Sequence, residues 1–140
     1  MPVFMLNNVN GSFSLAFNDE FRRLLSDASK EYLALEKSPV VSAFDNAMGN
    51  LKGTKQGVNH VKYVEVRDEE KQWQPSMFIL VVVNGSFFLS CNGSFGRVLL
   101  DIVDASGDEE GSQPLPLYAL GKSLDKQIYY KDKRRTGTDG

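Results

Sequence analysis

The sequence predicts an α+β fold in which an antiparallel sheet of about five to seven strands carries two helices on one face. Two observations lead to this class. The tetrapeptide Asn-Gly-Ser-Phe occurs three times between apolar runs, and the two helical patterns follow one another along the chain. Asn-Gly favours a type I′ hairpin turn because both central residues need a positive φ. Adjacent helices argue against a doubly wound α/β sheet. The pattern is also compatible with a curved sheet or a partial barrel.

The length of 140 residues fits one domain, which we place at residues 1–131, with a polar C-terminal tail at 132–140. Hydrophobic residues make up 41% and charged residues 24%, as in ordinary globular domains and unlike disordered chains. Cys91 is the single cysteine, which excludes a disulfide scaffold. No apolar run approaches the roughly 20 residues of a membrane span. The first residues lack a signal-peptide pattern, so we expect a cytoplasmic protein that does not bind membranes.

The first half of the chain predicts one hairpin and two helices. The hairpin joins residues 3–8 to 12–17 around Asn10-Gly11. Asn18 is a good N-cap for a first helix, whose apolar residues recur at spacings of three and four as far as Leu35. A second helix starts at Pro39, because proline suits the first helical position, and ends at Gly49.

The second half predicts a meander. A strand over 58–67 precedes 77–83, which is apolar at every position and is therefore expected to be central and covered on both faces. The second tetrapeptide turns into 86–91, and the third, Asn92–Phe95, turns into a strand over 95–103. A short strand over 115–120 and a strand or helical turn over 124–131 follow. Because the three tetrapeptides are unevenly spaced, we expect no repeat architecture.

Catalytic residues are scarce. No nucleophile, phosphate-binding or dinucleotide motif occurs, and His60 and Cys91 are the only residues of their kinds. Asp101 and Asp104 would fall on opposite faces of the predicted strand. The remaining acidic residues, Asp108, Glu109 and Glu110, are typical of a solvated loop. We therefore expect a protein that is not an enzyme and that binds no cofactor and no metal.

Basic residues alternate with aromatic residues in two stretches, and this pattern gives the first functional hypothesis. Single-stranded nucleic acid is held by cations along the phosphates and by aromatic faces that stack on the bases. The sequence thus predicts a small nucleic-acid-associated binding protein, of a phage or accessory kind. The predicted binding residues are Lys52, Lys55, Lys62, Tyr63 and Trp73 in one stretch, and Tyr129, Tyr130, Lys131, Lys133, Arg134 and Arg135 in the other.

The alternative hypothesis is a self-assembling or partner-binding structural protein of a phage or viral kind that binds no nucleic acid. The net charge of −2 favours it, because nucleic-acid-binding modules are usually basic. Phe87 and Phe88 are neighbours in a predicted strand, so they must point to opposite faces. If one face is open, one phenylalanine contributes to an exposed apolar patch, and such patches mark interfaces. A sheet edge could also pair with a second copy.

Overall fold

The computed structural model describes residues 1–51, 60–68, 71–107 and 113–137, with side chains for 1–51, 76–107 and 113–128. The elements, in chain order, are β1 (Phe4–Val9), β2 (Ser12–Phe17), α1 (Asp19–Leu35), α2 (Pro39–Leu51), β3 (His60–Asp68), β4 (Lys71–Val83), β5 (Ser86–Cys91), α3 (Gly93–Ala105) and α4 (Leu115–Gly137). Residues 132–137 of the predicted tail thus lie in α4.

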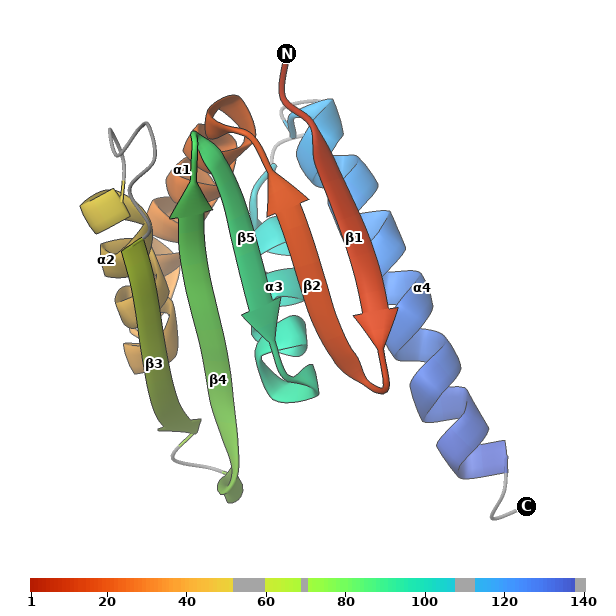
Figure 1. The fold of residues 1–140 in the computed structure, drawn as a ribbon. Coiled ribbons are helices and arrows are strands. Elements are labelled where there is room, and N and C mark those ends of the chain that lie inside the picture. Colours follow the sequence, from red (N-terminus) through yellow and green to blue (C-terminus); the bar gives the residue numbers. More distant parts are fainter. Residues whose placement is uncertain (52–59, 69–70, 108–112, 138–140) are drawn as a thin grey trace.

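The fold has two layers, a sheet and a layer of helices (Figure 1). All strand pairs are antiparallel, in the order β1-β2-β5-β4-β3, and the helices lie on one face. The predicted α+β class is confirmed. The sheet is open, with β1 and β3 at its edges, so it does not close into a barrel. In the part of the chain that the structure describes, no helix is long and apolar enough to cross a bilayer.

The first two Asn-Gly turns form as predicted. Asn10 and Gly11 have φ of 51° and 85°, and Asn84 and Gly85 have φ of 49° and 80°. These positive values at both central residues are those of a type I′ turn. The closing pairs are Val9 with Ser12 and Val83 with Ser86.

The third Asn-Gly-Ser-Phe does not form a turn, so the predicted strand over 95–103 was wrong. Asn92 is the N-cap of α3, and its side-chain oxygen accepts a hydrogen bond from Phe95 N at 3.0 Å. The residues that follow are spaced so that Phe95, Leu99, Ile102 and Val103 fall on one helical face, and this face is buried against the rest of the fold.

The C-terminal segments were also assigned wrongly. Residues 115–120 were predicted as a strand and 124–131 as a strand or a helical turn, but both lie in α4. Leu117, Leu120, Leu124 and Ile128 are buried at helical spacing. The predicted range of five to seven strands therefore counted segments that are helical.

The two halves of the fold are built alike, which corrects the expectation of no repeat. From Phe4 to Phe78 is 74 positions, and the same separation relates many residues of β1–β2–α1 to those of β4–β5–α3. Phe4, Leu6, Phe13, Leu15, Asn18, Phe21 and Leu25 recur as Phe78, Leu80, Phe87, Leu89, Asn92, Phe95 and Leu99. The tetrapeptide shared by the two hairpins is thus one part of a longer repeat. Each copy of this repeat also includes a helix, α1 in the first and α3 in the second.

The strand register obeys the same relation. Leu15 pairs with its own counterpart Leu89, and the pairs on either side of them exchange places, as a two-fold axis between β2 and β5 requires. Asn18 and Asn92 also play one role. Each caps a helix and also accepts a hydrogen bond from one of two equivalent backbone amides that are 74 positions apart, Val3 N at 3.1 Å and Met77 N at 3.2 Å. Two pseudo-symmetric hairpin–helix units, β1–β2–α1 and β4–β5–α3, therefore make up the fold apart from α2, β3 and α4.

One face of β4 is buried under helices and the other is not. Phe78, Leu80 and Val82 are at most 1% exposed, whereas Ile79 and Val81 between them are partly exposed. The expectation that 77–83 is covered on both faces was therefore wrong. Helices cover a single face of this sheet (Figure 1), so the apolar residues at the intervening positions belong to an uncovered surface.

Candidate functional site

The most distinctive surface of the protein is the side of the sheet that faces away from the helices, which we call the open face. Its described side chains are Met5, Asn7, Val9, Ser12, Ser14, Ala16, Met77, Ile79, Val81, Val83, Ser86, Phe88 and Ser90. Their positions follow from strand alternation, since the intervening residues are buried or point toward the helices. Among these described residues none is charged.

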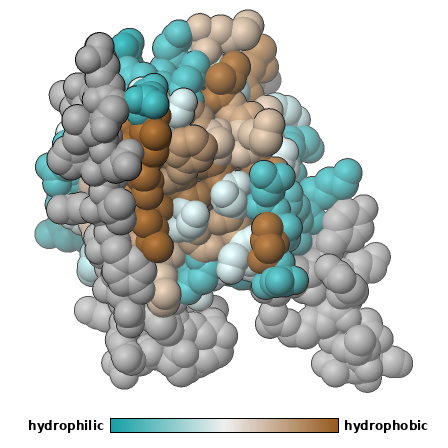
Figure 2. Space-filling model, viewed as in Figure 1, coloured by the Kyte–Doolittle hydropathy of each residue, from teal (hydrophilic) through white to brown (hydrophobic). Residues whose placement is uncertain are grey.

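Large apolar side chains on this face are exposed to solvent. Met5 is 64% exposed, Val9 59% and Phe88 42%. Figure 2 shows a hydrophobic surface that runs along β4 and continues over β5 and β2, interrupted by paler small residues. A contiguous uncharged patch with exposed apolar side chains on one side of a sheet is unusual for a protein that is monomeric in solution.

The strand register explains the relief of the open face. Met5, Ala16, Phe88 and Val81 lie opposite one another on adjacent strands and form a raised apolar row. The next row along the strands, which we call the serine row, is Asn7, Ser14, Ser90 and Ile79, and it is low at its two central serines. A hollow of about 350 Å³ lies over this second row, lined on the open face by Val9, Ser12, Ser14, Met77, Ile79 and Ser90.

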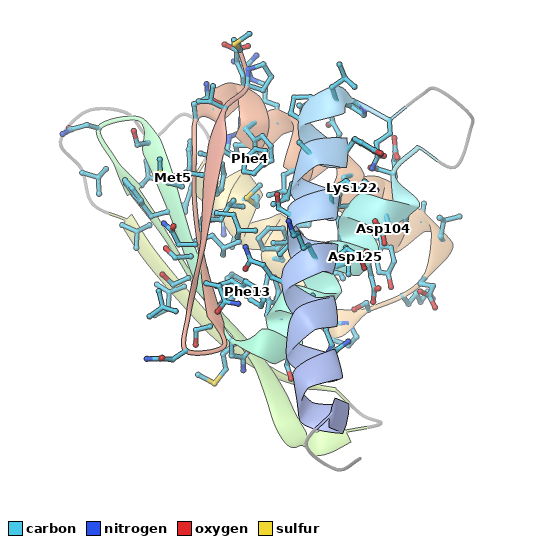
Figure 3. The ribbon with its side chains drawn as sticks, turned by 90° about the vertical axis from the view of Figure 1, so that its right-hand side faces the viewer. Phe4, Met5, Phe13, Asp104, Lys122 and Asp125 are labelled. Atoms are coloured by element: carbon cyan, nitrogen blue, oxygen red, sulfur yellow. The ribbon has the colours of Figure 1, made fainter. Side chains whose placement is uncertain are left out.

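Figure 3 shows the separation of the two sides of the sheet at its edge strand. Phe4 and Phe13 point toward the helices, whereas Met5, next to Phe4 in the chain, points away from them. On the helix side, Phe4 packs against Phe21 with ring centroids 5.1 Å apart. No comparable cover exists for Met5 among the described residues.

The predicted nucleic-acid-binding residues all lie where side chains are not described. Lys52 and Lys55 fall outside the described residues. The others have a described backbone: Lys62 and Tyr63 in β3, Trp73 in β4, and Tyr129, Tyr130, Lys131, Lys133, Arg134 and Arg135 in α4. In the register, Lys62 is opposite Leu80 and Tyr63 is opposite Ile79, so the two positions belong to opposite faces of the sheet.

The fold does not bring the two basic–aromatic stretches into one element or one edge. β3 is one edge strand, whereas α4 packs beside β1 at the other edge (Figure 1). A single groove that uses both stretches would have to cross the width of the sheet. The described open face between them offers no cation to a phosphate backbone.

The acidic residues of α3 form a cluster on the helix side. Asp101 and Asp104 are one helical turn apart on α3, so the prediction of opposite strand faces was wrong. Burial raises the pKa of Asp104, and the nearby Asp125 carboxylate of α4 raises it further (Figure 3). Burial likewise raises the pKa of Asp101, with Asp104 adding to the effect. Among the described residues, no group of three possible metal ligands converges. Asp108, Glu109 and Glu110 lie outside the described residues.

Cys91 and His60 are the remaining candidates for chemistry. His60 is the first residue of β3 and pairs with Val82 in the register. Cys91 ends β5 and is buried, and this burial raises the pKa of its thiol to about 12. Because a thiolate is the reactive form, the sulfur is suited to packing.

We expect Cys91 to react with a thiol reagent about a thousandfold more slowly in the folded protein than in urea at pH 8. The pKa of its thiol rises from 9.0 to about 12, and a shift of this size lowers the thiolate fraction by that factor. The Cys91 thiol of the unfolded chain loses its proton at a lower pH than the thiol of the folded protein. The free energy of unfolding is therefore expected to fall as the pH rises above about 9. Absorbance during reaction with a disulfide reagent measures the rate. Equal rates in both states would contradict the burial.

Sequence reasoning raised an exposed apolar patch at Phe87 or Phe88 but missed the extent of the open face, although a signal for it was present. The alternate positions of β1, β2 and β5 carry no charge and include exposed Met5, Val9 and Phe88, while a solvent-facing side of a sheet normally carries polar residues without such large apolar side chains. The run of seven apolar residues over 77–83 hid this, because it suggested cover on both sides. A scan against models of protein families, a search of curated proteins and a search of solved structures each found no match.

Proposed function

We propose that the protein is a self-assembling structural or accessory protein whose open face packs against the open face of a second copy. The observation that supports this most directly is the uncharged row of Met5, Ala16, Phe88 and Val81, in which Met5 and Phe88 are exposed and Ala16 and Val81 are partly exposed. The described part of the open face carries no charge, so two copies of it meet without like-charge repulsion, whereas a charged face would oppose its own copy. Sheets pack face to face about 10 Å apart with their strands nearly aligned, and their side chains interdigitate.

The size of the face is close to the lower limit for a specific interface. Four strands of six residues span roughly 400 Å² in projection, from a rise of about 3.3 Å and a spacing of about 4.8 Å. The relief of the side chains makes the accessible area larger than this. The total approaches the roughly 600 Å² per partner at which specific interfaces begin.

The relief of the face is self-complementary. A two-fold axis between the raised row and the serine row places the raised row of each copy over the serine row of the other. Phe88 then enters the hollow beside Ser14 and Ser90 of the second copy. The hollow measures about 350 Å³, which is enough for a phenyl ring.

Sedimentation velocity tests this proposal. We expect a dimer in the micromolar range and a weakening of at least tenfold in Phe88→Lys, because a charge would be buried between two apolar faces. Leu35→Lys is the matched control. Leu35 is a similarly exposed apolar residue at the end of α1, on the helix side, and is 64% exposed.

Two results would contradict self-assembly through the open face. The first is a wild-type protein that sediments as a monomer of 15.6 kDa at several hundred micromolar. The second is a dimer that Phe88→Lys and Leu35→Lys affect equally, which would move the interface away from the open face.

Binding of single-stranded nucleic acid stays a prediction for the basic–aromatic stretches. Fluorescence anisotropy with labelled oligonucleotides over roughly 50 to 200 mM salt measures it, since phosphate contacts weaken steeply over this range. Salt-dependent binding that Phe88→Lys leaves unchanged would assign nucleic acid to a surface other than the open face.

A further inference from the structure

We propose that the free edge of β1 is a strand-accepting site, which binds an extended segment of a partner protein antiparallel to β1. This site is separate from the open face and does not depend on self-assembly. It follows from the internal two-fold relation of the fold, which makes β1 the counterpart of β4. In the second half, β3 pairs along the outer edge of β4. In the described part of the chain, the equivalent edge of β1 pairs with no strand.

The hydrogen-bonding groups of this edge are arranged as they are in β4. In a two-residue hairpin the closing pair is hydrogen-bonded, so Val9 and every second residue before it bond to β2. The backbone groups of Asn8, Leu6 and Phe4 then point outward. Their counterparts are Val82, Leu80 and Phe78, which lie opposite His60, Lys62 and Val64 of β3. An added strand would meet the same donors and acceptors in the same order.

The burial of equivalent side chains shows what the missing strand would cover. Phe78 and Leu80, beside β3, are 1% and 0% exposed. Phe4 and Leu6 have the same side chains at the equivalent positions, yet both remain partly exposed. Part of the cover of Phe78 comes from Phe44 of α2 and Phe95 of α3. An antiparallel strand with apolar residues at alternate positions would add cover on the outer side of Phe4 and Leu6, where β3 lies beside their counterparts.

The edge also lacks the features that usually prevent strand addition. Natural edge strands are blunted by charged residues, prolines or bulges. β1 has the sequence Phe-Met-Leu-Asn-Asn-Val, with no charge and no proline, and it pairs with β2 in unbroken register. The edge is therefore open to backbone pairing in the way that strand-addition domains use it.

The helix layer favours a partner's segment over a second copy at this edge. α4 packs against β1 and extends beyond its outer edge (Figure 1). If β1 paired with β1 of a second copy, both α4 helices would lie under the same two strands, about one strand spacing of 5 Å apart. Helices need 8–10 Å between their axes. A single extended segment brings no such helix and can lie over α4.

The test uses the full chain with an added strand as the probe. A copy of residues 60–68, the strand that pairs with β4, is joined in front of Met1 through a short flexible linker. An antiparallel strand on β1 ends near the start of β1, so this link forms a new hairpin equivalent to β3–β4. The tether gives an effective concentration in the millimolar range. The matched control carries the same added segment with prolines at its alternate hydrogen-bonding positions.

Amide hydrogen exchange of Phe4, Leu6 and Asn8 is the readout. We expect at least tenfold slower exchange at these three amides in the fusion, and none of this protection in the proline control. Unchanged exchange in the fusion would overturn the proposal. In the unfused protein, protection of these three amides that grows with protein concentration would also overturn it, because the occupant would then be a second copy. Self-assembly through the open face is tested separately, by sedimentation of the Phe88→Lys variant. A negative result there is therefore distinguishable from unchanged amide exchange at β1.

Discussion

Replacing Phe95 by alanine is expected to lower the free energy of unfolding by about 3–5 kcal/mol, the usual cost of deleting a buried phenylalanine ring. Phe95 is fully buried at the start of α3. Its ring centroid lies 4.8 Å from that of Phe78 in β4 and 5.2 Å from that of Phe44 in α2. The ring thus lies between α3, α2 and β4. Its removal leaves a cavity that these three elements cannot fill by moving toward one another.

Urea denaturation followed by far-ultraviolet circular dichroism measures this loss. Tyr118→Ala is the control, because Tyr118 is an aromatic residue on α4 that is half exposed, and its loss is expected to cost less than 1 kcal/mol. Phe21 is the counterpart of Phe95 in the first half and is equally buried. Phe21→Ala is therefore expected to fall in the same range as Phe95→Ala. A cost below 1 kcal/mol for Phe95→Ala would contradict the placement of α3 against the sheet.

Replacing Gly96 by alanine is expected to destabilise the protein by about 1–3 kcal/mol, the range found for overpacked cores. A Cβ atom at this position would lie 2.6 Å from Phe13 Cε2 and 2.7 Å from Phe13 Cδ2. Phe13 is buried in β2 at 3% exposure, so its ring has to shift within the core to admit a methyl group at position 96. The absence of a side chain at position 96 is what lets α3 approach the sheet at this point.

Gly49→Ala is the matched control for this substitution. Gly49 lies in α2, and a Cβ atom there would meet nothing within 4 Å. Since alanine favours a helix over glycine by about 1 kcal/mol, Gly49→Ala is expected to stabilise the protein. The two variants should therefore shift the urea midpoint in opposite directions. Stabilisation by both would show that α3 and β2 are not in close contact at Gly96.

The candidate surface could be predicted from the sequence only in part. Strand alternation placed Phe87 and Phe88 on opposite faces, and the structure agrees, with Phe87 buried and Phe88 exposed. Which face the helices cover depends on contacts between residues far apart in the chain. For this reason 77–83 was interpreted as a doubly covered strand. The free edge of β1 could not be predicted either. Pairing of β2 with β5 is what places β1 at the edge of the sheet, and this pairing joins segments that are far apart in the chain.

Local sequence by itself determined the elements whose signals act within a few residues. Asn10-Gly11 and Asn84-Gly85 turn because they tolerate positive φ at both positions, and Asn18 caps α1 through its own side chain. Tertiary structure decided the third Asn-Gly-Ser-Phe. The tetrapeptide allows either a turn or a helix cap, and the choice follows from burial of Phe95, Leu99 and Ile102 against the sheet. Burial of a whole helical face outweighs a preference of about 1 kcal/mol in a turn, so long-range packing made this third copy a helix.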